Sequence, residues 1–127
     1  LLESSTIDYE NLYDVGYEEI VQCYQRCDIV SFPSVYEGFG VPILEANAAG
    51  RPIIAGDIPV LHEVANDAAC FVNPYSVDSI RSGFVKVIEH DEYREELVAK
   101  GLKNIERFSP KAIAEKYNEV YKELSDE

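Results

Sequence analysis

The chain has 127 residues, the length of one ordinary domain, and 46% of them are hydrophobic, which excludes an intrinsically disordered chain. Its 24 acidic and 11 basic residues give a formal net charge of −13. Because nucleic acids and anionic membranes need surplus cations, both are excluded as general partners, and a bound phosphate would find few cations here. With neither a basic leader nor a long apolar run, we expect a cytoplasmic protein. Since it opens at Leu1 and contains no Met, we expect the chain to be part of a longer one.

The hydrophobic pattern predicts strands alternating with helices, and then helices alone. Short apolar runs that stop at Gly, Pro or Asn predict strands over 11–15, 28–32, 51–55 and 69–72. Apolar residues three and four apart, with Pro at several helix starts, predict helices over 17–27, 41–49, 59–66, 76–90 and 92–108, and a final helix opened by Ser109-Pro110. This order is typical of an α/β, Rossmann-like three-layer domain with a parallel sheet. Ligands of such sheets bind beyond the carboxyl ends of the strands, which nominates the loop 34–40.

That loop and the helix after it carry the residues best suited to a ligand. Glu37 lies before the helix and Glu45 lies one turn inside it, with two glycines between them. The amides of Phe39, Gly40 and Val41 precede Pro42 at a helix start, where free N–H groups suit an anionic or hydroxyl-rich ligand. A carboxylate on each side suits the diols of sugars. Two isolated glutamates are ordinarily solvated, so it is their combination with the glycines and the helix start that favours a site.

The segment 37–54, E-G-F-G-V-P-I-L-E-A-N-A-A-G-R-P-I-I, resembles the donor-binding signature of glycosyltransferase family 4, the group 1 glycosyltransferases of the GT-B fold. Its mark is two glutamates separated by seven residues. The resemblance extends to Y-Q-R-C-D at 24–28, to L-H-E-V at 61–64 and to Phe108-Ser109-Pro110, and covers about residues 11 to 124. It implies that residues 1–127 are the C-terminal, nucleotide-sugar-binding half of a GT-B enzyme, cut short at the N-terminal side and lacking the acceptor-binding N-terminal domain.

The resemblance also implies roles for individual residues. Glu37, as the catalytic residue, would bind hydroxyls of the transferred sugar or lie close to the reacting centre. The amides of Phe39 and Gly40 would contact that sugar, and those of Gly40 and Val41 the diphosphate. Glu45 would accept hydrogen bonds from the ribose.

The implied reaction is the transfer of a hexose, with retention of configuration, from a nucleotide-diphosphate sugar such as a UDP- or GDP-hexose to a hydroxyl of a sugar or glycolipid acceptor. The product would be a surface polysaccharide or glycolipid. Tyr17 would lie at the rim of the base site. No cofactor is expected, and no metal, since the chain has no Asp-x-Asp motif.

The family holds the diphosphate with an Arg and a Lys that precede the region covered here. Arg26 and Arg51, the two basic residues in the first 80, match neither position. We therefore expect this chain alone to bind a nucleotide sugar weakly and to transfer nothing, and only a longer protein, completed by its N-terminal domain, to associate peripherally with a membrane.

Two other functions and one structural question stay open at this stage. The chain could be a non-catalytic nucleotide-sugar-binding module, or part of a sugar-nucleotide epimerase of the GT-B fold. The apolar stripe of the final helix, which includes Ile113, Tyr117, Tyr121 and Leu124, could pack on this domain or cross back to the first domain of a GT-B enzyme.

Overall fold

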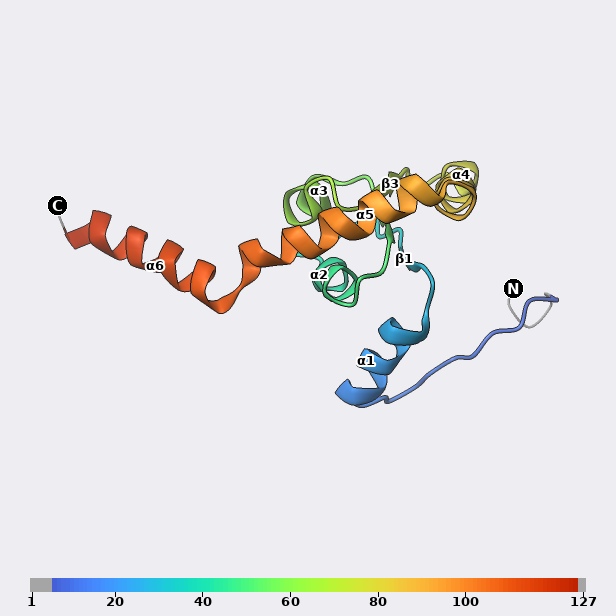
Figure 1. The fold of residues 1–127 in the computed structure, drawn as a ribbon, viewed down its shortest axis with the longest axis horizontal. Helices are drawn as coiled ribbons and strands as arrows, with labels where there is room; N and C mark the ends of the chain where they lie inside the picture. Colours follow the sequence, from blue (N-terminus) through green and yellow to red (C-terminus); the bar gives the residue numbers. More distant parts are fainter. Residues whose placement is uncertain (1–5, 126–127) are drawn as a thin grey trace.

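The computed structural model describes residues 6–125, in which strands alternate with helices as far as residue 72 (Figure 1). In chain order the elements are α1 (Tyr17–Arg26), β1 (Val30–Phe32), α2 (Val41–Ala48), β2 (Ile53–Gly56), α3 (Pro59–Ala65), β3 (Cys70–Val72), α4 (Val77–Glu89), α5 (Asp91–Asn104), the 3-10 helix η1 (Ile105–Phe108) and α6 (Pro110–Ser125). The predicted order of elements from residue 17 onward is confirmed, with strands that are shorter than expected.

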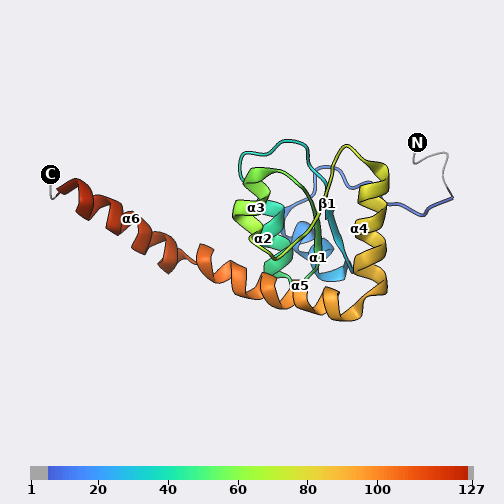
Figure 2. The ribbon, with the colours of Figure 1, turned by 90° about the horizontal axis from the view of Figure 1, so that it is seen from above.

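The three strands form a parallel sheet in the order β1-β2-β3. Alternate side chains of a strand point to opposite faces, so Ile53 and Ala55 of β2 join the core beneath α2 and α3, while Ile54 joins the core beneath α4 and α5. Every residue of β2 is buried, as expected for a central strand covered on both faces. Figure 2 shows α2 and α3 on one side of the sheet and α4 on the other, which confirms the three-layer α/β prediction.

A buried polar network fastens α5 to α2 and α3. Asn104 Nδ2 donates hydrogen bonds to Asn47 Oδ1 at 3.0 Å and to the Val64 carbonyl oxygen at 2.9 Å. Arg107 Nη1 donates to Asn104 Oδ1 at 2.7 Å. Asn47 and Asn104 are only 1% and 5% exposed, and every buried side-chain polar atom within residues 6–125 has a hydrogen-bond partner. The network therefore links three helices without leaving a buried group unpaired.

The strand predicted over residues 11–15 is wrong. These residues have no regular secondary structure, and Asn11, Leu12 and Tyr13 are exposed. Asp14 has a φ of 53°, in the left-handed region, which an extended strand cannot contain. The helix predicted over 92–108 is also divided, because α5 ends at Asn104 and the next four residues tighten into η1.

The last helix, α6, projects away from the layered part of the fold (Figures 1 and 2). None of its described residues is buried, and Tyr117, Tyr121 and Leu124 are each more than 60% exposed. The alternative in which this stripe packs on the domain is therefore wrong in this structure. That the helix crosses to another domain stays a prediction.

Candidate functional site

The loop between β1 and α2 holds Glu37 at the carboxyl edge of the sheet. Ser34 Oγ donates a hydrogen bond to Glu37 Oε1 at 2.6 Å, and the Glu37 side chain is half-buried. Gly56, the last residue of β2, passes so close that a Cβ there would lie 2.1 Å from the Ser34 carbonyl oxygen. The loop is thus packed tightly against the end of β2, and Ser34 of this loop orients one oxygen of the Glu37 carboxylate.

Gly40 makes the sharp junction between this loop and α2. Its φ of 98° lies in a region that side-chain-bearing residues rarely adopt. A Cβ at Gly40 would lie 2.5 Å from Leu61 Cδ2, and Leu61 belongs to α3. A side chain at position 40 is therefore disfavoured both by the positive φ and by the contact with Leu61. The backbone of Gly40 is buried where α2 and α3 meet.

The first turn of α2 presents unpaired amides at this junction. Within residues 6–125, no carbonyl or side chain accepts a hydrogen bond from the N–H groups of Phe39, Gly40 or Val41. Pro42 has no N–H, and the Ile43 amide donates to the Gly40 carbonyl at 3.0 Å. Three neighbouring donors at the positive end of a helix dipole can bind an anion without any lysine or arginine.

Glu45 lies one turn further along α2 and faces α1. The Tyr24 hydroxyl donates a hydrogen bond to Glu45 Oε2 at 2.8 Å. Burial, and then the Glu45 carboxylate, raise the pKa of the Tyr24 phenol well above its usual value, so this hydroxyl stays protonated and remains a donor. A cavity of about 410 Å³ lies between the two helices, and Tyr17, Tyr24 and Glu45 all line it.

The predicted residues thus fall into two groups along α2. Glu37 and the free amides of Phe39, Gly40 and Val41 lie at its start, whereas Glu45 and Tyr17 lie in the cavity beside α1. Sequence reasoning missed the contact of Tyr24 with Glu45 because it counted Tyr24 among the apolar residues, three and four apart, that predicted the helix over 17–27. The signal that could have found it is a tyrosine among those residues, since a partly buried phenol usually has a hydrogen-bond partner.

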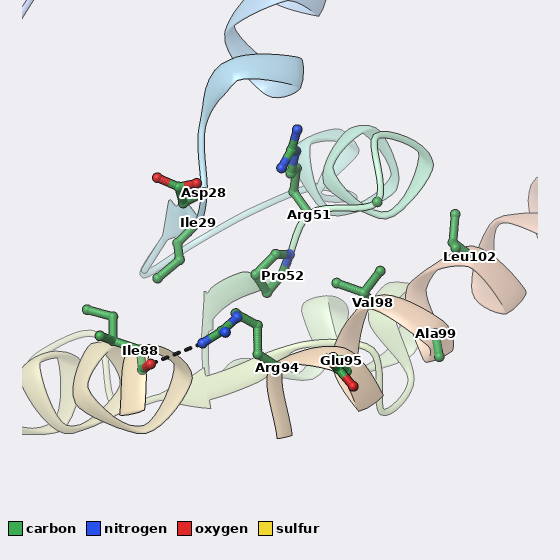
Figure 3. Close-up of a pocket in the computed structure, with 11 residues that line it drawn as sticks. Asp28, Ile29, Arg51, Pro52, Ile88, Arg94, Glu95, Val98, Ala99 and Leu102 are labelled. Carbon is green, nitrogen blue, oxygen red and sulfur yellow. Dashed lines mark hydrogen bonds between the residues drawn. The ribbon is translucent and has the colours of Figure 1, made fainter. Parts of the chain in front are cut away.

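A larger cavity, of about 780 Å³, lies at the opposite, amino end of the sheet (Figure 3). Its two arginines already have partners. Arg94 Nη1 donates to the carbonyl oxygens of Val87 and Ile88 at 2.9 and 3.0 Å, and Arg51 donates to the carbonyls of Tyr24 and Gln25. Both guanidinium groups therefore cap the ends of helices, α4 and α1 respectively.

Within residues 6–125, no group of three or more His, Cys, Asp or Glu side chains is arranged to hold a metal ion. No helix there has both the length and the hydropathy needed to cross a membrane.

The chain was compared with protein families and individual proteins. The family model for group 1 glycosyl transferases matches residues 11–104. The chain belongs to this family. Its predicted resemblance to the group 1 enzymes is confirmed.

One relative and two solved structures show how far the similarity extends. The O-antigen chain mannosyltransferase B of Escherichia coli is 36% identical over 92 residues, which cover 72% of this chain and 24% of that protein. The C-terminal domain of a group 1 glycosyl transferase from Francisella tularensis superimposes with a TM-score of 0.66 at 27% identity, over 75% of this chain and 50% of that one. Sucrose-phosphate synthase from Thermosynechococcus elongatus gives a TM-score of 0.76 at 22% identity, over 91% of this chain and 30% of that one, which bears on the fold alone.

The fold of this group 1 chain is thus that of the C-terminal domain of GT-B glycosyltransferases. The chain spans about a quarter, 24%, of the length of its mannosyltransferase relative. The matched residues include both glutamates and the free amides at the start of α2.

Proposed function

We propose that this chain is the donor-binding part of a retaining glycosyltransferase, which moves a hexose from a nucleotide-diphosphate sugar to an acceptor hydroxyl. The observation that carries the proposal is the order along the chain of Glu37, three unpaired amides at the start of α2, and Glu45 one turn further along that helix. A nucleotide sugar has the matching order of groups, with sugar hydroxyls at one end, a diphosphate in the middle and ribose hydroxyls at the other. The acceptor would bind to a further domain.

In this proposal each group binds one part of the donor. Glu37, oriented by Ser34, accepts hydrogen bonds from the transferred sugar at the reacting centre, and the amides of Phe39 and Gly40 contact the same sugar. The amides of Gly40 and Val41 hold the diphosphate, whose charge grows as the bond to the anomeric carbon breaks. Glu45 accepts from the ribose.

The amides matter because cations are scarce in this half of the chain. Arg26 and Arg51 are the basic residues among the first 80, and the Arg51 guanidinium is bonded to carbonyls of α1 at the far end of the sheet. The diphosphate would therefore depend on helix-start amides, and on cations supplied from outside this chain.

We further propose mannose as the transferred sugar and a surface polysaccharide as the product, on the ground that one relative is an O-antigen mannosyltransferase. Independence of metals and cofactors, cytoplasmic location and peripheral membrane contact of a longer protein stay predictions. So does the N-terminal domain that would complete the enzyme.

The test is transfer of labelled mannose from GDP-mannose to a lipid-linked sugar acceptor, by a protein in which this chain is joined to an acceptor-binding domain. Glu37→Gln keeps the size of the side chain but removes its charge, and should lower turnover by about 100-fold or more. The control is Glu95→Gln, since Glu95 lines the cavity at the amino end of the sheet and should tolerate the change. Full turnover in Glu37→Gln would contradict the proposal. Release of nucleoside diphosphate that depends on the acceptor would exclude an epimerase.

A further inference from the structure

The contact between Tyr24 and Glu45 joins two helices through residues 21 positions apart. The Tyr24 ring packs against the core cluster beneath α2 and α3, while its hydroxyl reaches Glu45 Oε2 at 2.8 Å. Both side chains are half-buried, so this bond is partly shielded from water. The phenol therefore combines an anchored ring with a donor directed at one carboxylate oxygen.

The backbone of Tyr24 is fixed as well. Arg51 Nε donates to the Tyr24 carbonyl oxygen at 3.1 Å, and the Cys27 thiol donates to the same oxygen at 3.4 Å. Arg51 lies just before β2, so the last turn of α1 is tied to the central strand of the sheet. Both the ring and the main chain of Tyr24 therefore have contacts that orient its hydroxyl toward Glu45.

The Tyr24 hydroxyl limits the hydrogen-bonding positions that the Glu45 carboxylate can offer to a ligand. A carboxylate has about four positions that accept hydrogen bonds, and Tyr24 occupies one of them on Oε2. Glu45 also lines the cavity of about 410 Å³, whose other walls include the apolar side chains of Ile20, Leu44 and Ala48. An acceptor fixed in such surroundings discriminates between ligands that differ by one hydroxyl, because a missing donor leaves the carboxylate unpaired.

We propose that Tyr24 is the positioning residue for Glu45, and that the pair makes the site prefer a ribonucleotide to a 2′-deoxyribonucleotide. The inference rests on the proposed ribose role of Glu45 and adds both a residue and a selectivity to it. Tyr24 itself need not touch the ligand, since it acts by holding Glu45 in the orientation that receives two neighbouring hydroxyls.

The experiment measures a ratio of affinities. The 127-residue chain is titrated by NMR with GDP and UDP and with their 2′-deoxy counterparts, at millimolar concentrations because binding is expected to be weak. The unaltered chain should prefer the ribonucleotide by about tenfold, Tyr24→Phe by about threefold, and Glu45→Ala not at all. Tyr121→Phe removes a hydroxyl from an exposed side chain of the projecting α6, and should keep the full ratio.

The outcomes distinguish the positioning role of Tyr24 from the ribose role of Glu45. If Glu45→Ala loses the preference while Tyr24→Phe keeps it, the positioning role is wrong and the ribose role of Glu45 stands. If Tyr24→Phe loses affinity equally for the ribonucleotide and the 2′-deoxyribonucleotide, the role of Tyr24 is only structural and the inference is also overturned. If Glu45→Ala keeps the preference, or if the unaltered chain has none, the ribose role fails, and the inference falls with it.

Discussion

The two ends of the parallel sheet differ in whether their polar groups already have hydrogen-bond partners. At the carboxyl end, the amides of Phe39, Gly40 and Val41 have no partner within residues 6–125. At the amino end lies the larger cavity, of about 780 Å³, but the guanidinium groups of Arg51 and Arg94 that line it are already bonded to helix carbonyls. The proposed site therefore rests on unpaired polar groups and not on the size of a cavity. What distinguishes the carboxyl end is the supply of polar groups that still lack partners.

The largest effect should come from Gly40→Ala at the carboxyl end. An alanine there would have to adopt a φ of 98° and would overlap Leu61, so we expect the free energy of unfolding to fall by about 2–4 kcal/mol. Nucleotide affinity should fall at least about tenfold, because the free amides would move. Urea denaturation and NMR titration measure the two effects.

The matched control for this change is Gly38→Ala. A Cβ at Gly38 would meet nothing within 4 Å, and its φ is not positive, so stability should change by less than about 0.5 kcal/mol. Equal destabilisation by both substitutions would contradict the account of the junction at Gly40.

The next effect should come from Asn104→Ala in the buried polar network. It removes the donor to Asn47 Oδ1 and to the Val64 carbonyl, and we expect a loss of about 2–3 kcal/mol in urea denaturation. Asn118→Ala on the exposed face of α6 is the control, and should change little. Because this network is structural, nucleotide affinity of the folded variant should stay within about twofold. A tenfold loss of affinity would show that the network belongs to the site.

A smaller effect is expected from Arg94→Met at the amino end. The variant loses the hydrogen bonds to the Val87 and Ile88 carbonyls at the end of α4, which should cost about 1 kcal/mol in thermal or urea unfolding. Nucleotide affinity should not change. Weaker nucleotide binding by this variant would indicate that the nucleotide binds in the larger cavity, and would contradict a site at the carboxyl end.

The smallest effect concerns the ionisation of Tyr24. Burial and the Glu45 carboxylate raise its pKa above the usual value of about 10, so its contribution to stability is complete below that pH and is lost as the pH rises further. Tyr24→Phe has no phenol to ionise, so its stability should fall less steeply above pH 10 than that of the unaltered chain. Parallel stability curves for the two proteins would show that the phenol is not shielded.

Much of the fold could be predicted because its signals are local. Apolar runs marked the three strands, and Pro and Gly marked the ends of α2. The failure at residues 11–15 has a tertiary cause, since a strand needs a neighbour to pair with and Asp14 instead adopts a left-handed conformation. The break after Asn104 could not be foreseen either, because Asn104 bonds to α2 and α3, which are distant in sequence.

The candidate site also has one part that could be predicted from the sequence and one part that could not. The glycines, the two glutamates and the helix start lie within nine residues, so their combination could be recognised in the sequence as a candidate site. The bond from Tyr24 to Glu45 spans 21 residues, and that from Arg51 to Tyr24 spans 27. Neither bond has a local sequence pattern. The orientation of Glu45 and the bonding of Arg51 to helix carbonyls could therefore be seen only in the structure.

The most direct test of the account is an NMR titration of the ¹⁵N-labelled chain with GDP and UDP, which reports where the nucleotide binds. We expect the largest shifts at the amides of Phe39, Gly40 and Val41, together with the residues around Glu45. Shifts concentrated instead at Gly50, Arg51 and Val98, which line the larger cavity, would contradict the assignment of the site to the carboxyl end of the sheet. So would the absence of any shift at millimolar nucleotide.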